Sequence, residues 1–188
     1  CLPLHIFERR YREMINTVLD KDGCFGVLLY DPFRKGPAEI GCSAQIFDCK
    51  RLRDGRMNIM TLGMQRFRVR SYIYGKPYLQ GSIEWIDDEQ VAPNLHDTAF
   101  GVVEVLKDVI KLSGKLADRL IEFPEDLPDD PVDLSYWIAS SIYGLAQEQQ
   151  ELLEMTNTEK RLLRESEILT SIRRELAART AIEQAFSH

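Results

Sequence analysis

The 188-residue sequence predicts an α+β protein, with a β-rich half at residues 1–90 and a helical half at residues 91–188. Two observations carry this prediction. The hydrophobic residues first alternate with a period of two and then, beyond Pro93, recur with a period of about 3.6 residues. The charge also changes sign, because residues 1–80 carry 14 Lys and Arg against 8 Asp and Glu, a net charge of +6, whereas residues 81–188 carry −12.

The β-rich half is expected to contain one early helix. The run PLHIF at residues 3–7 has the character of a strand, and Gly23 suits the left-handed position that ends a helix. The apolar residues between them recur at helical spacing: Tyr11, Met14, Ile15, Val18 and Leu19. The apolar run CFGVLLY at residues 24–30 lies between turn signals, which predicts a buried strand followed by a loop.

Alternation of apolar and polar residues predicts the remaining strands. In the segment 40–47 the apolar side chains fall on every second position: Ile40, Cys42, Ala44 and Ile46. The dipeptide at residues 54–55, Asp-Gly, is a strong hairpin signal. Three more strands are expected after it, at residues 57–63, 65–75 and 77–87.

The helical half is divided by turn and cap signals. One helical face is expected from Ala99, Val102, Val103, Leu106 and Ile110. Asp130 and Pro131 supply an N-cap and a first helical residue for a second helix, whose apolar stripe continues to Leu145. A short helix is expected at residues 148–155. Thr156 and Glu159 have the spacing of a capping box, which predicts a last helix that runs to Phe186.

Motifs of several enzyme classes are absent from the sequence. It contains no G-x-x-x-x-G-K-[ST] phosphate loop, no H-E-x-x-H zinc motif and no G-x-G-x-x-G dinucleotide motif. The segment GCSAQ, which contains Ser43, starts like a nucleophile elbow, but Gln45 stands where the second glycine is needed, and Ser43 is expected in mid-strand. We therefore expect no catalytic residue and no enzyme, with a hydrolase that uses Ser43 as the remote alternative.

The cysteines and histidines do not predict a metal site. No two cysteines form a C-x-x-C pair, and the three histidines are scattered: His5, His96 and His188. No apolar run approaches the roughly 18 residues of a membrane span. We expect no metal, no cofactor and no membrane span, and we expect the four cysteines to be small core residues in a reducing compartment: Cys1, Cys24, Cys42 and Cys49.

The segment RFRVR raises an anion-binding hypothesis. On a strand Arg66, Arg68 and Arg70 share one face, and Phe67 and Val69 share the other. Together with the basic residues of the segment 50–56, the three arginines could bind phosphates of a nucleic acid or another anionic surface. The alternative is a solvated outer face of the sheet, whose charges discourage edge pairing. The net charge of −6 for the whole chain favours this alternative.

Aromatic side chains give a second candidate surface. We select Phe33, Tyr72, Tyr74 and Tyr78 as candidate protein-binding residues, because exposed aromatic clusters are typical of interfaces. Tyr74 beside a turn glycine is expected to be the most exposed of the tyrosines. Trp85 is expected to belong to the core.

Five segments, in this order and spacing, resemble the N-terminal substrate-recognition domain of ATP-dependent Lon proteases: PLHIFERRYREMI, FGVLL, IGCSAQI, the L-x-DGR hairpin and GMQRFRV. The segment 137–176 is similar to the closing helices of that family. The pattern is closest to the stand-alone Lon-domain proteins of cyanobacteria and plastids, which lack the ATPase and protease parts.

The resemblance implies a twisted, antiparallel, β-barrel-like subdomain followed by a helical bundle with a long last helix. It implies a family strand upstream of Cys1, whose absence would leave an unpaired edge near residues 3–7. The implied function is a non-catalytic module, in the cytoplasm or the plastid stroma, that binds exposed apolar or unfolded polypeptide segments or acts as an adaptor. Its helical half could support homo-oligomers. Nucleic-acid binding through the three arginines is the alternative function.

Overall fold

The computed structural model describes residues 1–89, 95–124 and 126–186, with the backbone alone for residues 184–186. The chain divides into two compact units, Cys1–Asp87 and Asp88–His188. We call them the sheet unit and the helical unit. The expected α+β class is confirmed, because antiparallel strands precede a series of helices.

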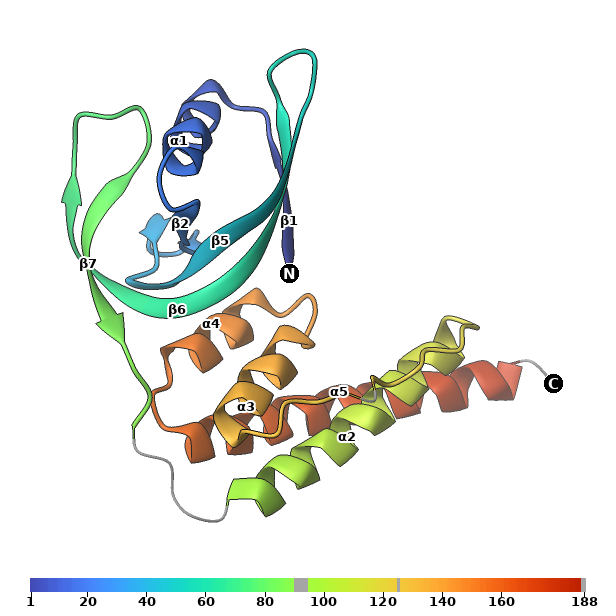
Figure 1. Cartoon of the computed structure of the whole chain (residues 1–188). Coiled ribbons are helices and arrows are strands. Elements are labelled where there is room, and N and C mark those ends of the chain that lie inside the picture. The colour runs from blue at the N-terminus through green and yellow to red at the C-terminus, as the bar shows by residue number, and fades with distance from the viewer. Residues whose placement is uncertain (90–94, 125, 187–188) are drawn as a thin grey trace. The chain divides into compact units, whose positions relative to one another are not determined.

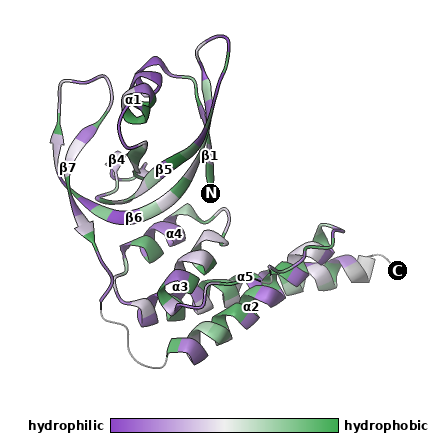
Figure 2. Ribbon diagram, viewed as in Figure 1, coloured by the Kyte–Doolittle hydropathy of each residue, from purple (hydrophilic) through white to green (hydrophobic). Residues whose placement is uncertain are grey.

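One long strand, β6 (Met57–Ile73), organises the sheet unit. Its neighbour on one flank is β5 (Ile40–Arg51), which in turn pairs with β2 (Cys24–Val27). The other flank of β6 has a different partner at each end: β1 (Leu2–Ile6) and β7 (Gln80–Ile86). All these pairings are antiparallel. The curvature of β6 is visible in Figure 1, and Figure 2 shows hydrophobic and hydrophilic residues following one another along it.

The predicted early helix is confirmed as α1 (Arg9–Leu19). Its fully buried Ile15 belongs to a small core that also contains Ile6 of β1 and Ile59 of β6. Polar contacts tie α1 to the region of the β5–β6 turn: Nη1 of Arg12 donates to the carbonyl oxygen of Asp54 at 3.2 Å. The amphipathic stripe in the sequence therefore marks the face by which α1 packs on the sheet.

The segment predicted as one strand at residues 24–30 and a following loop is divided further. After β2, a separate small hairpin forms from β3 (Tyr30–Asp31) and β4 (Gly36–Pro37). The carboxylate of Asp31 accepts hydrogen bonds from the backbone N–H groups of Phe33 and Arg34, which fixes the turn between the two strands. The loop prediction missed this hairpin because its two strands are only two residues long.

The helical unit contains four helices in the described residues: α2 (Leu95–Leu116), α3 (Pro131–Ser140), α4 (Ala146–Glu154) and α5 (Thr158–Phe186). Figure 1 shows α2 and α5 running side by side over much of their length. Their facing side chains, with those of α3 and α4, form one apolar core that includes Leu106, Ile138, Leu152, Leu162 and Leu169. None of the described helices combines the length and hydrophobicity needed to cross a bilayer.

Two cap predictions have different outcomes. The carboxylate of Asp130 accepts hydrogen bonds from the N–H groups of Val132 and Asp133, so the predicted N-cap of α3 is confirmed. The predicted capping box that begins at Thr156 is wrong. Asn157 caps α5 instead, accepting at Oδ1 from the N–H of Lys160 at 3.0 Å.

The predicted continuation of the second helix to Leu145 is also wrong. The helix α3 ends at Ser140, and Gly144 has a φ of +82°, a conformation that favours glycine. Ile142 is nevertheless 2% exposed. The apolar spacing predicted burial correctly but could not show that the chain leaves the helix between two buried residues.

Candidate functional site

The edge strand β7 presents an apolar surface next to the core of the sheet unit. In the register of β6 and β7, Trp85 lies opposite Phe67 and Ile83 lies opposite Val69, so these four side chains share one face. Phe67 is buried, whereas Ile83 and Trp85 are 40% and 50% exposed. The face formed by Phe67, Val69, Ile83 and Trp85 is called the β7 surface below.

Two glycines make room for the floor of this surface. A Cβ on Gly26 would lie 2.8 Å from the Phe67 ring, and a Cβ on Gly41 would lie 3.1 Å from the same ring and 2.3 Å from the carbonyl oxygen of Val27. Real side chains avoid such distances, so both positions require glycine if Phe67 is to keep its place. Phe67 is thus wedged against the backbones of β2 and β5, and it supports Trp85 at the edge.

The opposite face of the same ladder is ionic. Arg68 lies opposite Glu84 in the register and forms an ion pair with Glu39 at 3.9 Å. Arg70 forms an ion pair with Glu84. Because each of these arginines has an acidic partner, the two do not form a continuous cationic ribbon.

The predicted solvated stripe of Arg66, Arg68 and Arg70 is wrong in one respect. Arg66 is 5% exposed, whereas Arg68 is half-buried and Arg70 is exposed. The register between β6 and β7 shifts between Val69 and Ser71, which places Arg70 at a β-bulge. Simple alternation therefore does not extend through the RFRVR segment, and Arg66 is not available to an anion at the surface.

The aromatic candidates are distributed over different environments. Phe33, in the turn between β3 and β4, is 90% exposed, and Tyr74, just after β6, is 86% exposed. Tyr72 is half-buried near the end of β6. Tyr78 is only 9% exposed, so its selection as a surface residue is corrected. The expectation that Trp85 belongs to the core is wrong as well, because an edge strand covers only part of so large a ring.

The sequence reasoning missed a second exposed apolar group on β6. Leu62 and Met64 are 49% and 57% exposed. Within β6, the pairing with β1 ends at Thr61 and the pairing with β7 begins at Arg66. Among the described residues, the stretch between them is therefore paired with β5 alone. No periodic signal marks them, since the gap arises from the lengths of two strands that are distant in sequence.

Ser43 is hydrogen-bonded within the sheet. Its hydroxyl donates to the carbonyl oxygen of Gln65 at 2.9 Å and accepts from the N–H of the same residue at 3.1 Å, where the β5–β6 register shifts. Burial raises the pKa of the neighbouring Cys42 thiol, which disfavours the reactive thiolate. Within the described ranges, no three His, Cys, Asp or Glu side chains come together in a way that would hold a metal ion.

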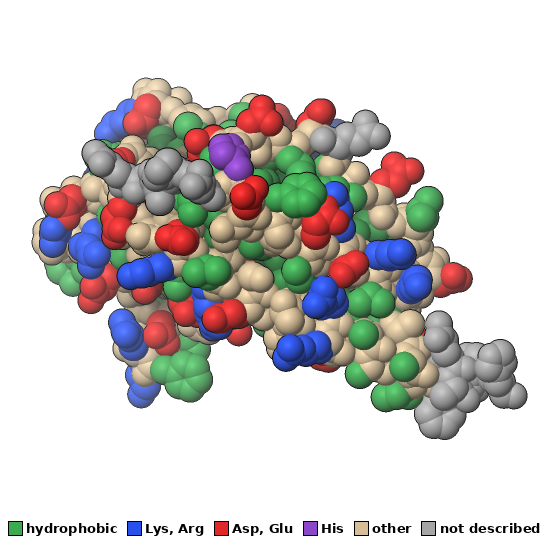
Figure 3. Space-filling model, turned by 90° about the horizontal axis from the view of Figure 1, so that it is seen from below, with side chains coloured by type: hydrophobic (Ala, Val, Ile, Leu, Met, Phe, Trp, Pro, Cys, Tyr) green, Lys and Arg blue, Asp and Glu red, His purple; other side chains and the backbone are tan. Residues whose placement is uncertain are grey.

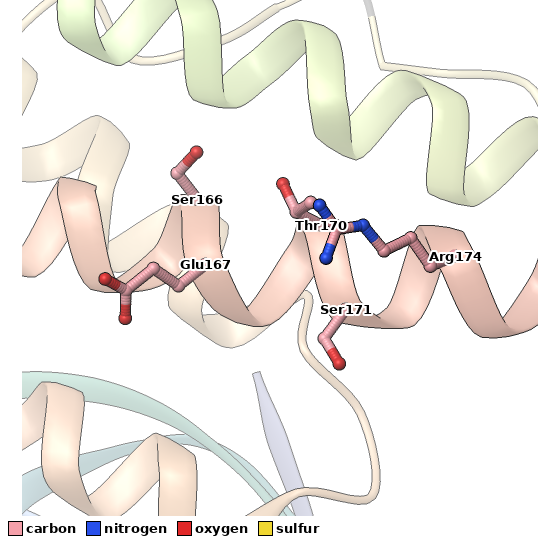
Figure 4. Close-up of a pocket in the computed structure, with 5 residues that line it drawn as sticks. All are labelled: Ser166, Glu167, Thr170, Ser171 and Arg174. Atoms are coloured by element: carbon pink, nitrogen blue, oxygen red, sulfur yellow. The ribbon is translucent and has the colours of Figure 1, made fainter.

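The helical unit has a shallow, open hollow of about 330 Å³ along α5, which is lined by Ser166, Glu167, Thr170, Ser171 and Arg174. Figure 4 shows that these side chains come from successive turns of one helix. No histidine, cysteine or lysine is among them to activate a hydroxyl group. On the face seen in Figure 3, basic and acidic side chains are interspersed rather than segregated.

Residues 1–171 match the family described as the ATP-dependent protease La (LON) substrate-binding domain. The Lon protease of Syntrophus aciditrophicus is 23% identical over 171 positions, which cover 85% of this chain and 22% of that protein. Lon protease 2 of Myxococcus xanthus is 23% identical over 192 positions, which cover 98% of this chain and 23% of that protein. The chain thus spans about a fifth of the length of these relatives.

Two solved structures share the fold. The Lon N-terminal domain protein from Xanthomonas campestris aligns with a TM-score of 0.60 at 22% identity, covering 86% of this chain and 85% of that one. The N-terminal domain of the Mycobacterium avium complex Lon protease aligns with a TM-score of 0.62 at 16% identity, covering 90% of both chains. Because the family match extends over most of the sequence, the chain belongs to the family of the Lon substrate-binding domain.

Proposed function

We propose that the chain is a non-catalytic protein-binding module that captures extended polypeptide segments with exposed apolar side chains, and that the segment adds to the free edge of β7. The observation that carries this proposal is the position of Ile83 and Trp85 on an edge strand. The family description, a substrate-binding domain, supports a protein ligand.

Strand addition explains how one surface can accept many sequences. In the described part of the chain β7 pairs only with β6, and the residues from Gln80 to Trp85 are all exposed, so the second edge of β7 has unpaired backbone groups. A bound segment would satisfy these groups through its main chain, whatever its sequence. Its apolar side chains would then pack on Ile83 and Trp85, and tryptophan is a frequent energetic centre of interfaces.

Binding of this kind also suits an adaptor. A chain that holds an unfolded segment on β7 can present it to another protein through the helical unit, where exposed apolar side chains such as Phe100 and Tyr143 are available. A second copy of the chain is a competing occupant of the β7 edge, since its own β7 has the same unpaired groups. Homodimer formation through β7 would therefore reduce binding of polypeptide.

The direct test uses Trp85 as a reporter. The sequence has two tryptophans, so the variant Trp137→Phe leaves Trp85 alone to fluoresce. We expect a blue shift of its emission when a permanently unfolded protein without tryptophan, such as reduced and carboxymethylated ribonuclease A, is added. The same protein with its disulfides intact should cause no shift. An unchanged emission with demonstrated binding would place the ligand away from β7.

Variants then locate the site. Ile83→Asp should weaken binding of the labelled unfolded protein by about tenfold or more, because it puts a charge into the apolar contact. Phe100→Asp, an equivalent change on the helical unit, is the matched control and should leave affinity unchanged. If Phe33→Ala or Tyr74→Ala weakens binding and Ile83→Asp does not, the sequence-selected aromatic residues form the site instead.

Ionic strength separates this function from anion binding. The affinity for an added apolar strand should be nearly the same at low and moderate salt, whereas the affinity for phosphates falls steeply as the salt concentration rises. A labelled single-stranded oligonucleotide is the comparison ligand. Affinity for the oligonucleotide that exceeds affinity for unfolded protein at physiological salt would contradict the proposed function.

A further inference from the structure

A charged cluster lies inside the helical unit. Ser135 of α3 and both Arg161 and Glu165 of α5 are fully buried. Nε of Arg161 donates to the hydroxyl of Ser135 at 2.7 Å, and that hydroxyl donates to Oε1 of Glu165 at 2.8 Å. The guanidinium also lies over the ring of Tyr136, 4.1 Å from its centroid. Buried ionic groups are costly unless paired, so this cluster needs a compensating charge.

The first residue of the helical unit supplies that charge. Both carboxylate oxygens of Asp88 accept from Arg161, at 3.2 Å from Nη1 and 2.7 Å from Nη2. The two remaining N–H groups of Arg161 are directed to the carbonyl oxygen of Met155 at 2.9 Å and the hydroxyl of Thr158 at 3.4 Å. All five N–H groups of the guanidinium thus have acceptors. Asp88 neutralises the charge of Arg161 in a bidentate pair.

The neighbouring residue, Glu89, is fixed to the same region. Its N–H donates to the carbonyl oxygen of Thr156 at 2.9 Å. Its carboxylate accepts from the hydroxyl of Thr156 and from Nδ2 of Asn157, each at 2.9 Å. Residues 88–89 follow the last strand of the sheet unit in the sequence, and we call them the junction segment. These hydrogen bonds anchor the junction segment at the N-terminal end of α5.

Glu165 has no such compensation. Its Oε2 is buried and, among the residues that the structure describes, has no hydrogen-bond partner. Arg161 is the charged group that acts on it, and Asp88 accepts hydrogen bonds from that guanidinium and from the hydroxyl of Tyr136. From α2 and α4, the core receives apolar side chains such as Val102 and Leu152. Burial raises the pKa of Glu165 to about 8, which agrees with a carboxyl group held in its neutral form.

Two carboxyl groups therefore face one cation. While Asp88 neutralises Arg161, ionisation of Glu165 would add a buried negative charge, and no second cation in the described part of the chain balances it. Arg161 would neutralise that charge if its guanidinium turned from Asp88 toward Glu165. The required movement is small, because the hydroxyl of Ser135 already contacts both Arg161 and Glu165. We propose that Asp88 and Glu165 compete for Arg161, so that the junction segment is clipped to the helical unit while Glu165 carries its proton and is released when Glu165 loses it.

Linkage makes the competition measurable from either side. The carboxyl carbon of Glu165 is titrated by NMR in the wild type, in Asp88→Asn and in Glu89→Gln. Removal of the Asp88 charge should lower the pKa of Glu165 by one unit or more, which is at least a tenfold shift in its proton affinity. Glu89→Gln removes an adjacent charge that does not touch Arg161, and it should leave the titration unchanged. Equal titrations in the wild type and Asp88→Asn would overturn the proposal.

Release of the junction segment is tested by amide exchange. The N–H of Glu89 donates to Thr156, so its protection factor reports whether the segment is clipped. After correction for base-catalysed exchange, protection in the wild type should fall about tenfold between pH 6.5 and pH 9.5, the amount that matches one unit of pKa coupling. Glu165→Gln should show no such fall, and Glu175→Gln, an exposed change on the same helix, should behave as the wild type.

The wild type alone can contradict the proposal. Constant protection of the Glu89 amide across this pH range means that the segment stays clipped after Glu165 has titrated. A fall of the same size in Glu165→Gln would assign the change to another group. If Glu165→Gln does not fold, the wild-type exchange and the Asp88→Asn titration still decide between the outcomes.

Discussion

Trp85 of β7 meets Phe67 of β6 edge to face, with ring centroids 6.3 Å apart and ring planes at 87°. The two rings are direct neighbours in the ladder, yet one is 4% exposed and the other 50%. The pair therefore connects the core of the sheet unit to its surface. We expect Phe67 to stabilise the fold and Trp85 to be available for binding. Substitution of each residue should therefore affect stability to a different extent.

We expect Phe67→Ala to reduce the free energy of unfolding by about 3–5 kcal/mol, as for a large core side chain whose removal leaves a cavity. Trp85→Ala should reduce it by only about 1 kcal/mol, because half of the ring is already in water. Urea denaturation followed by circular dichroism measures both. If the order is reversed, the register assigned to the β6–β7 ladder is wrong.

The three arginines of β6 should differ in the same assay. Arg66→Ala should cost about 1–3 kcal/mol of unfolding free energy, because the side chain is buried and the interaction that it makes would be lost. Arg68→Ala should stay within about 0.5 kcal/mol, as expected for a partly exposed residue with a long ion pair. Identical midpoints for the two variants would indicate that Arg66 is solvated after all.

Two glycine-to-alanine changes should alter the stability of the fold in opposite directions. At Gly41 the new Cβ would lie 2.3 Å from the carbonyl oxygen of Val27, so Gly41→Ala should destabilise the fold by about 2 kcal/mol or more. Gly101 is in α2, and apart from the nearby backbone of that helix no described atom lies within 4 Å of a Cβ placed there, so Gly101→Ala should stabilise the fold by up to about 1 kcal/mol through helix propensity. Thermal melts of the pair give the comparison, and stabilisation by Gly41→Ala would show that β2 and β5 are farther apart.

The raised pKa of Glu165 predicts how stability depends on pH. The folded chain holds this proton up to about pH 8, whereas the unfolded chain releases it near pH 4.5. The stabilisation from the buried neutral acid is therefore complete below pH 4.5, declines as pH rises, and is lost above pH 8. Glu165→Gln should remove this decline, and Glu175→Gln should retain it. Urea midpoints at pH 5, 7 and 9 report the difference, and parallel profiles for the wild type and Glu165→Gln would contradict the assignment.

Periodicity and turn chemistry account for what the sequence could predict. The stripe on α1, the Asp-Gly turn between β5 and β6 and the Asp130 cap depend on local rules, and each element is present. Arg66 and Trp85 were placed wrongly for a different reason. Burial of a residue on a strand depends on what covers each face and edge, and that is set by partners distant in sequence.

The charged cluster illustrates the same limit. Arg161 and Glu165, four residues apart, have the spacing of an ordinary surface ion pair on a helix. The sequence signal that could have distinguished them is the spacing, because Ile168 and Leu169 continue the same helical stripe. The structure shows that both of these residues are buried. Polar residues within an apolar stripe indicate a buried network, but the identity of its partners, Asp88 and Ser135, requires the tertiary structure.

The pairing of β6 with three strands has a kinetic consequence. Its contacts with β5 and β7 close short loops, whereas pairing with β1 joins Leu2 to Thr61 across most of the unit's length. Loop closure costs more entropy as separation grows, so the β5–β6 hairpin should form early and β1 should dock late in folding. Substitutions in the hairpin should then slow folding, while substitutions in β1 should mainly accelerate unfolding.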